Sequence, residues 1–228
     1  MASLYLVRHG QASFGADNYD VLSDLGVQQC HLLGQWWKER GLAPDRVFCG
    51  PMRRHRQSLD AFCAGLDREF ASASLHGIAE FDHENVLEVY HPEFSDKAAI
   101  LRFLADTPRP RQAFHEIFTA AIARWHDGRH DGEYNESWPV FRQRVLAAFA
   151  ELRQNSGDAI VFTSGGVISV IVQAILGLDD ARCFALNAIT INSSVTRILY
   201  RQEEASLHSF NNTAHLDVHN DSALVTYR

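Results

Sequence analysis

The sequence predicts an α/β fold, a three-layer sandwich in which helices cover a mostly parallel sheet and an inserted helical cap is added. Short apolar segments typical of buried strands alternate with amphipathic segments at helical spacing, and the joints between them are short. Between residues 78 and 139 this alternation stops, and charged, aromatic helical segments follow one another. We therefore expect a single domain over residues 1–228, with the cap inserted at about 78–139.

The first strand and helix are the clearest elements. Residues 3–7 (SLYLV) predict an apolar strand, and the polar stretch that continues to Asp20 predicts a loop. Ser23 is typical of a helix N-cap, and the apolar residues after it recur at helical spacing. Gly41 is expected to end this helix, and residues 46–49 (RVFC) predict the second strand.

The later elements follow from the same patterns. We expect Pro51 to open a second helix. Within the cap, helices are expected at about 93–105 and 110–127, with the segment AEFDHENVLE (79–88) as a carboxylate-rich loop. A helix at about 139–154 then leads to the strand DAIVFT (158–163), to a helix that starts at Gly165-Gly166, and to closing strands in AITINSSVTRILY and SLHSFNNTAHL.

Composition excludes several classes of function. The net charge is −7, so no positive field attracts nucleic acid, and any phosphate site has to be built locally from a few arginines. The N-terminus has no basic segment followed by an apolar core, and no run of 18 apolar residues occurs. We therefore expect a cytoplasmic protein with no membrane partner.

Cysteine and histidine patterns do not indicate a metal site. The four cysteines are far apart and form no CxxC motif, so we expect core thiols. His126 and His130 lie among Asp and Gly residues, which favours a surface loop over metal ligands.

Three polar groups follow strands of the predicted sheet. Arg8-His9 follows the first strand, GPMRRHRQS (50–58) follows the second, and Ser164-Gly165-Gly166 follows the late one. Ligands of open α/β sheets bind at the carboxyl ends of the strands, so we expect these groups to converge. An imidazole with one nitrogen held and the other free can attack phosphorus, and guanidinium groups can hold the phosphoryl oxygens.

A proton donor for the leaving oxygen has three candidates in the loop 79–88, namely Glu80, Asp82 and Glu84. Simpler interpretations remain open for the individual motifs. The run Arg53, Arg54, His55, Arg56 also fits the solvated face of a helix, and Glu80 alone also fits a surface carboxylate.

The ordered blocks LVRHGQA, LSDLGVQQC, GPMRRHRQS, TSGGVIS and SFNNTAHL resemble those of the histidine phosphatase superfamily, the phosphoglycerate mutase-like group. The resemblance covers nearly the whole chain. The family's Leu-Thr/Ser-x-x-Gly-x-x-Gln block is matched by Leu22, Ser23, Gly26 and Gln29, and its Ser-Pro-Leu-x-Arg-Ala block by Pro51, Met52 and Arg54.

The resemblance implies a role for each site residue. His9 would be the nucleophile that forms a phosphohistidine, with Arg8 and Arg54 on the phosphoryl oxygens and Glu80 as the proton donor, Asp82 being the reserve. The substrate-binding residues are expected to be Gln11, Ser13, Ser164 and Gly165. No metal and no cofactor are expected, because the arginines neutralise the charge. The implied activity is hydrolysis of a phosphorylated small molecule or a phosphoprotein.

One position departs from the family pattern. The family's block reads His-Gly-Gly, and its histidine donates a hydrogen bond to a phosphoryl oxygen, whereas this chain has Ser164. A neutral hydroxyl is a weaker donor than an imidazolium by roughly 1 to 1.5 kcal/mol. We expect activity to be retained, with His83, His91 or His215 as candidates for the missing donor. On this interpretation Ser164→His raises kcat, and an unchanged or lower kcat would show that another group already fills the role of the missing donor.

Two other functions compete with a phosphatase. A non-catalytic phosphate-binding or regulatory protein would explain the altered site, although it would not need the Arg8-His9 pair. A phosphoglycerate mutase ranks lower, because it must keep and return its phosphoryl group. The sequence indicates neither the natural substrate nor the oligomeric state.

Overall fold

The structure is a computed structural model that describes residues 1–13, 20–201 and 204–227. Part of the predicted loop before Asp20 therefore lies outside the described residues. The described strands form a six-stranded sheet in the order β3-β2-β4-β1-β5-β6. Their bounds are β1 Ala2–Arg8, β2 Arg46–Cys49, β3 Ala73–Ser74, β4 Ala159–Thr163, β5 Val195–Arg201 and β6 Glu204–Asn212.

The sheet is mixed. β1 and β4, β2 and β4, and β2 and β3 pair in parallel, whereas β5 pairs antiparallel with both β1 and β6. The predicted α/β class is confirmed, and the strands predicted at 3–7, 46–49 and 158–163 are β1, β2 and β4. The parallel strands β2, β4 and β1 are direct neighbours, so their carboxyl ends share one edge of the sheet.

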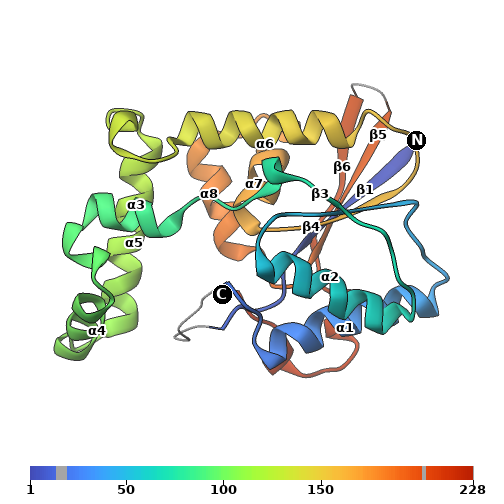
Figure 1. Cartoon of the computed structure of the whole chain (residues 1–228), viewed down its shortest axis with the longest axis horizontal. Coiled ribbons are helices and arrows are strands. Elements are labelled where there is room, and N and C mark those ends of the chain that lie inside the picture. Colours follow the sequence, from blue (N-terminus) through green and yellow to red (C-terminus); the bar gives the residue numbers. More distant parts are fainter. Residues whose placement is uncertain (14–19, 202–203, 228) are drawn as a thin grey trace. The chain divides into compact units, whose positions relative to one another are not determined.

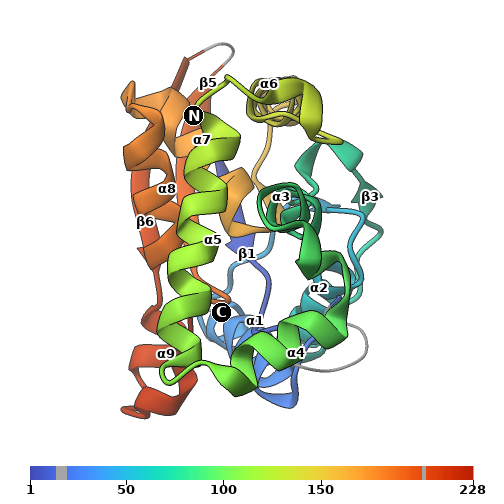
Figure 2. The ribbon, with the colours of Figure 1, turned by 90° about the vertical axis from the view of Figure 1, so that its left-hand side faces the viewer.

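The chain divides into two compact units, one made of Met1–Glu80 with Val145–Arg228, and one of Phe81–Arg144. The prediction of a single domain with a cap at 78–139 stays a prediction. In the first unit, α1 and α2 lie side by side on one face of the sheet, and α7 and α8 lie on the other (Figures 1 and 2). The helices of this unit are α1 Asp24–Glu39, α2 Arg53–Leu66, α7 Gly165–Leu176, α8 Asp180–Ile189 and α9 Ala214–Asp217.

The helix ends in this unit mostly match the sequence signals. Ser23 is the N-cap of α1, and its side chain accepts a hydrogen bond from the Gly26 N–H. Gly41 follows that helix with φ of +62°, which suits glycine. The prediction for α2 is wrong by two residues, because Met52 is extended and the helix begins at Arg53, not Pro51.

The C-terminal region contains helices as well as strands. α8 was not predicted, and its N-cap Asp179 accepts a hydrogen bond from the Arg182 N–H. In SLHSFNNTAHL, the predicted strand ends at Asn212, and His215 lies in the short helix α9. The C-terminus is fastened near α1, because the Gln29 amide donates to Leu224 O at 2.8 Å and to Thr226 Oγ1 at 2.9 Å.

The second unit is helical. It contains α3 His83–Tyr90, α4 Lys97–Asp106 and α5 Pro110–His126, and α6 Trp138–Leu152 begins in it and ends in the first unit. The helix predicted at 93–105 is shorter, because a 3₁₀ turn (Pro92–Ser95) precedes α4. The other short 3₁₀ helices are His76–Ile78, Asp131–Glu133 and Ser222–Leu224.

Aromatic side chains form the core of this second unit. Phe81 stacks on Trp125 with ring centroids 4.8 Å apart, and Phe141 and Trp138 pack against Trp125 at 5.8 and 5.4 Å. These four rings are buried. These aromatic side chains therefore serve to pack the core of the second unit.

Two expectations from composition can be compared with the structure. All four cysteines are buried and free, in agreement with core thiols. Among the described residues, no helix combines the length and apolar character that crossing a membrane requires.

Candidate active site

The alternation of side chains along β1 and β4 places the first two site residues. Val7, Ile160 and Phe162 face the core that the sheet shares with α1 and α2. Successive side chains of an extended chain point to opposite faces, so His9 and Ser164, each two residues further on, face the same side. The parallel pairing continues to this point, because the His9 N–H donates to Thr163 O at 2.9 Å. His9 and Ser164 therefore lie side by side.

His9 has the tautomer that a nucleophile needs. Its Nδ1 lies 2.7 Å from the Gly10 carbonyl oxygen, which only accepts hydrogen bonds, so Nδ1 carries the proton and Nε2 has a free lone pair. Burial holds the pKa of His9 well below its usual value, and the charges of Arg54 and Arg8 lower it further. The ring is therefore neutral at neutral pH.

Arg54 is the buried arginine of the run that begins α2. Its side chain is 3% exposed, and its Nη1 donates to Asp20 Oδ1 at 3.1 Å. Arg53 and Arg56 are exposed, so the interpretation as a solvated helix face fits those two residues only. The charge of Arg54 is one of the causes of the low pKa of His9.

Arg8 directly precedes His9, and its side chain points to the opposite face of the sheet because successive side chains of an extended chain alternate. Its Nη1 donates to the carbonyl oxygen of Thr190, just after α8. Its Nε lies 3.6 Å from the point where a Cβ at Gly165 would be, and that Cβ would also collide with Asn187 Oδ1. A larger residue at position 165 would therefore require the Asn187 side chain to move. The charges of both arginines lower the pKa of the same imidazole.

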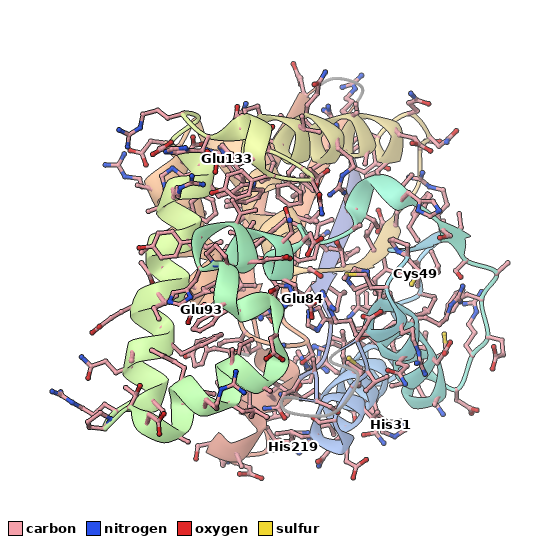
Figure 3. The ribbon with its side chains drawn as sticks, turned by 60° about the vertical axis from the view of Figure 1, so that its left-hand side comes forward. His31, Cys49, Glu84, Glu93, Glu133 and His219 are labelled. Atoms are coloured by element: carbon pink, nitrogen blue, oxygen red, sulfur yellow. The ribbon has the colours of Figure 1, made fainter. Side chains whose placement is uncertain are left out.

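Glu80, one of the three candidate acids, is bonded to the start of α7. The Gly166 N–H, in the first turn of α7, donates to Glu80 Oε2 at 3.1 Å. Asp82 belongs to the second unit, where it caps α3 by accepting from the Asn85 N–H at 3.0 Å. Glu84 is exposed in the first turn of the same helix (Figure 3).

Ser164 is bonded to a histidine that the sequence analysis missed. Its Oγ lies 2.7 Å from His55 Nε2, and both side chains are fully buried. Burial and the charge of Arg54 lower the pKa of His55 to about 3, so this ring is also neutral. A signal was present in the sequence, because His55 precedes Leu59 and Phe62 at spacings of four and seven residues, on the apolar stripe of α2.

The predicted substrate-binding residues of the loop after β1 take part in local hydrogen bonds. The Gln11 side chain accepts from Ser23 Oγ at 2.9 Å, and Ser13 Oγ donates to Leu22 O at 3.1 Å. The Gln11 N–H donates to Gln29 Oε1 at 2.9 Å. These contacts hold the loop against the start of α1, and the substrate-binding roles of Gln11 and Ser13 stay predictions.

None of the three histidines proposed to replace the missing donor is the partner of Ser164. His215 is buried in α9, with its Nε2 2.8 Å from Ser193 Oγ. His91 stacks on Phe94 inside the second unit, with centroids 4.1 Å apart, and His83 is the first residue of α3.

The geometry defines an imidazole flanked by guanidinium groups at the carboxyl edge of an α/β sheet. The family model described as the histidine phosphatase superfamily (branch 1) matches residues 4–213. The chain belongs to this superfamily.

Several solved structures share the fold. Phosphoglycerate mutase from Bacillus anthracis str. Sterne has a TM-score of 0.65 and 15% identity, over 96% of this chain and 97% of that one. The mycobacterial glucosyl-3-phosphoglycerate phosphatase has a TM-score of 0.63 and 19% identity, over 94% and 100%. The α-ribazole phosphatase from Shigella flexneri has a TM-score of 0.62 and 16% identity, over 93% and 97%. No curated protein matches the sequence significantly.

Proposed function

We propose that this protein is a metal-independent phosphatase that hydrolyses phosphomonoesters through a phosphohistidine on His9. The observation that carries the proposal is the tautomer of His9, whose Nδ1 is held by the Gly10 carbonyl so that Nε2 is free. A neutral, oriented imidazole is what a nucleophile requires and what a simple phosphate-binding site does not need. Arg8 and Arg54 supply the positive charge that a bound phosphoryl group requires.

The first half of the proposed reaction transfers the phosphoryl group to the enzyme. The lone pair of His9 Nε2 forms a bond to phosphorus, and the bond between phosphorus and the ester oxygen breaks. The leaving oxygen takes a proton from the Glu80 carboxyl group. Arg8 and Arg54 bind the equatorial oxygens, where negative charge accumulates in the transition state.

The second half returns the enzyme to its starting state. A water molecule attacks phosphorus and gives its proton to the Glu80 carboxylate, while the bond between phosphorus and Nε2 breaks and its electron pair returns to His9. Inorganic phosphate then leaves. The proposed substrates are phosphorylated small molecules or phosphoproteins, bound by local positive charge in a chain whose net charge is −7.

The test is hydrolysis of a generic aryl phosphate by the wild type and by His9→Ala, each with and without EDTA. We expect turnover by the wild type that EDTA does not reduce and that vanadate inhibits. Rapid quenching should trap phosphate on His9 in an acid-labile, base-stable form. A wild-type rate no higher than that of His9→Ala would contradict the proposal and favour a phosphate-binding protein.

A further inference from the structure

The pair formed by His55 and Ser164 has a role that the resemblance does not assign. We propose that the two residues act as one hydrogen-bond donor, in place of the single histidine that the family pattern expects at position 164. Ser164 is the catalytic residue, whose hydroxyl donates to a phosphoryl oxygen. His55 is the positioning residue, whose Nε2–H donates to Ser164 Oγ and so turns the hydroxyl hydrogen toward the phosphoryl oxygen. The inference rests on the proposed phosphatase function.

The position of Ser164 beside the nucleophile supports this role. His9 and Ser164 end neighbouring parallel strands and face the same side of the sheet, as described above. The rings of His9 and His55 lie 5.8 Å apart between centroids, so His55 and Ser164 are both near the atom that would carry the phosphoryl group. Ser164 also precedes the first turn of α7, whose N–H groups favour an anion.

The ring of His55 lies beside position 164, where a histidine in the rotamer of Ser164 would have its own ring. The Cγ of a histidine and the Oγ of a serine are both bonded to Cβ, so in the same rotamer they occupy nearly the same point. A histidine at position 164 would therefore put its Cγ about 2.7 Å from His55 Nε2, which is closer than two such atoms can approach. The ring of His55 fills the space that the expected ring would need.

His55 lies on α2 at the position where the family block has alanine, directly after Arg54. Its ring packs against Gly50, because a Cβ at Gly50 would collide with His55 Nδ1. A glycine before the helix and a histidine in it are therefore matched to each other. The chain has a serine where the family has histidine and a histidine where it has alanine, and the two side chains are hydrogen bonded.

The direction of the hydrogen bond depends on the charge of the site. His55 Nδ1 is buried and has no hydrogen-bond partner among the described residues, so Nε2 accepts from the Ser164 O–H when the single proton of the neutral ring lies on Nδ1. The charged or titratable groups that act on the ring there are Arg54, on α2 itself, and His9, at the end of β1. A phosphoryl anion beside His9 favours the imidazolium form of His55.

Protonation of His55 reverses this hydrogen bond. One proton, from a substrate monoanion or from solvent, binds to Nε2, and Nε2–H then donates to Ser164 Oγ. The hydroxyl hydrogen of Ser164 is thereby released to donate to a phosphoryl oxygen. When phosphate leaves, the proton leaves with it or returns to solvent, so no net proton is consumed by the pair.

Four variants test the proposal, with kcat and KM measured on an aryl phosphate and Tm measured for each. Ser164→Ala and His55→Ala should each lower kcat about 10- to 100-fold with little change in KM, because the donor acts mainly on the transition state. The double variant His55→Ala/Ser164→Ala should be no slower than the slower single variant, as expected for residues that act as a unit. His55→Ala/Ser164→His should recover most of the lost kcat.

A second buried histidine–serine pair provides the matched control. His215 and Ser193 are bonded at 2.8 Å, and burial likewise lowers the pKa of His215 to about 3. His215→Ala should lower Tm as His55→Ala does, while kcat stays within about twofold of the wild type. If His55→Ala does not fold, Ser164→Ala still tests the proposal, because it removes only one oxygen atom and so disturbs the fold little.

The outcomes separate the two proposals. If His9→Ala abolishes turnover but Ser164→Ala keeps the wild-type kcat, the donor pair is refuted and the phosphatase stands. The donor pair would also be refuted if the loss of kcat in the double alanine variant equalled the product of the two single losses. It would be refuted as well if His55→Ala/Ser164→His recovered none of the lost kcat. If the wild type is no faster than His9→Ala, the phosphatase fails first, and the pair fails with it.

Discussion

The imidazole rings of His9 and His55 lie with their centroids 5.8 Å apart and their planes 36° apart, although one follows β1 and the other lies on α2. Both are buried, and the pKa of each is lowered, first by burial and then by Arg54. A charge on either ring disfavours a charge on the other, as the influence of His55 on the pKa of His9 shows. The site therefore holds two neutral imidazoles beside two guanidinium groups.

The low pKa of His9 predicts the acid limit of the reaction. An ordinary histidine with a pKa near 6.5 would lose its nucleophilic form below that pH, but His9 stays neutral. We expect the rate of phosphohistidine formation, measured by rapid quenching at saturating substrate, to show no enzyme ionisation near pH 6.5. The second ionisation of the substrate is titrated separately. An inflection near pH 6.5 that the substrate does not explain would contradict the assignment.

Arg54 and Arg53 form a matched pair of adjacent arginines, one buried and one exposed. Removal of the buried guanidinium should lower kcat/KM of Arg54→Ala by about 10³-fold or more, because that charge stabilises the transferring phosphoryl group. Arg54→Lys should recover little, since an ammonium cannot provide the planar fork. Arg53→Ala should keep kcat/KM within about twofold. Equal losses in the two alanine variants would show that only general charge matters.

Glu80 can be tested through the leaving group. Glu80→Gln should lower kcat strongly for an alkyl phosphate, whose leaving oxygen needs a proton, and much less for p-nitrophenyl phosphate. The exposed Glu84→Gln is the control and should change neither rate. The quantity to compare is the loss of kcat with the alkyl phosphate divided by the loss of kcat with p-nitrophenyl phosphate. A ratio near one for Glu80→Gln would assign the proton transfer to another group.

His215 predicts a loss of stability in acid. Its pKa is about 3 in the folded chain and 6.5 in the unfolded chain, so between these values the unfolded state binds one more proton. The free energy of unfolding then falls as pH falls below 6.5, by up to about 1.4 kcal/mol per pH unit. In urea unfolding at pH 6.5 and 5, His215→Ala should lose up to about 2 kcal/mol less than the wild type.

The control for this linkage is the exposed His208 on β6. His208→Ala should lose as much stability between the two pH values as the wild type does. The two variants are compared by slope, because His215→Ala also leaves a cavity that lowers stability at every pH. Equal slopes for His215→Ala and the wild type would contradict the low pKa.

The fold and the strand ends of the site could be predicted because local signals specify them. The β-type run before Arg8-His9, the N-cap Ser23 and the strand before Ser164 each have a pattern that acts over a few residues. The secondary structure of residues 79–88 was harder to predict, because the carboxylates of this segment suggested a loop. In the structure Asp82 is the N-cap of the helix α3.

The pairing of His55 with Ser164 could not be predicted in the same way. The two residues are 109 positions apart, and only the order of β2 and β4 in the sheet brings them together. The charged neighbours of His55 suggested a solvated helix face, although its spacing from Leu59 and Phe62 placed it on the apolar stripe. The hydrogen bond from the Gly166 N–H to Glu80 likewise joins residues that are distant in sequence, so the position of Glu80 could not be predicted from its local pattern.

The fastening of the C-terminus near α1 matters for anyone who alters that end of the chain. Thr226 accepts from the Gln29 amide, and its own hydroxyl donates to Asn192, whose side-chain amide in turn holds the carbonyl oxygen of His9. Deleting the final residues, or fusing a tag directly after Tyr227, would disturb these hydrogen bonds and loosen the backbone at His9. An expression design with its affinity tag at the N-terminus avoids that disturbance.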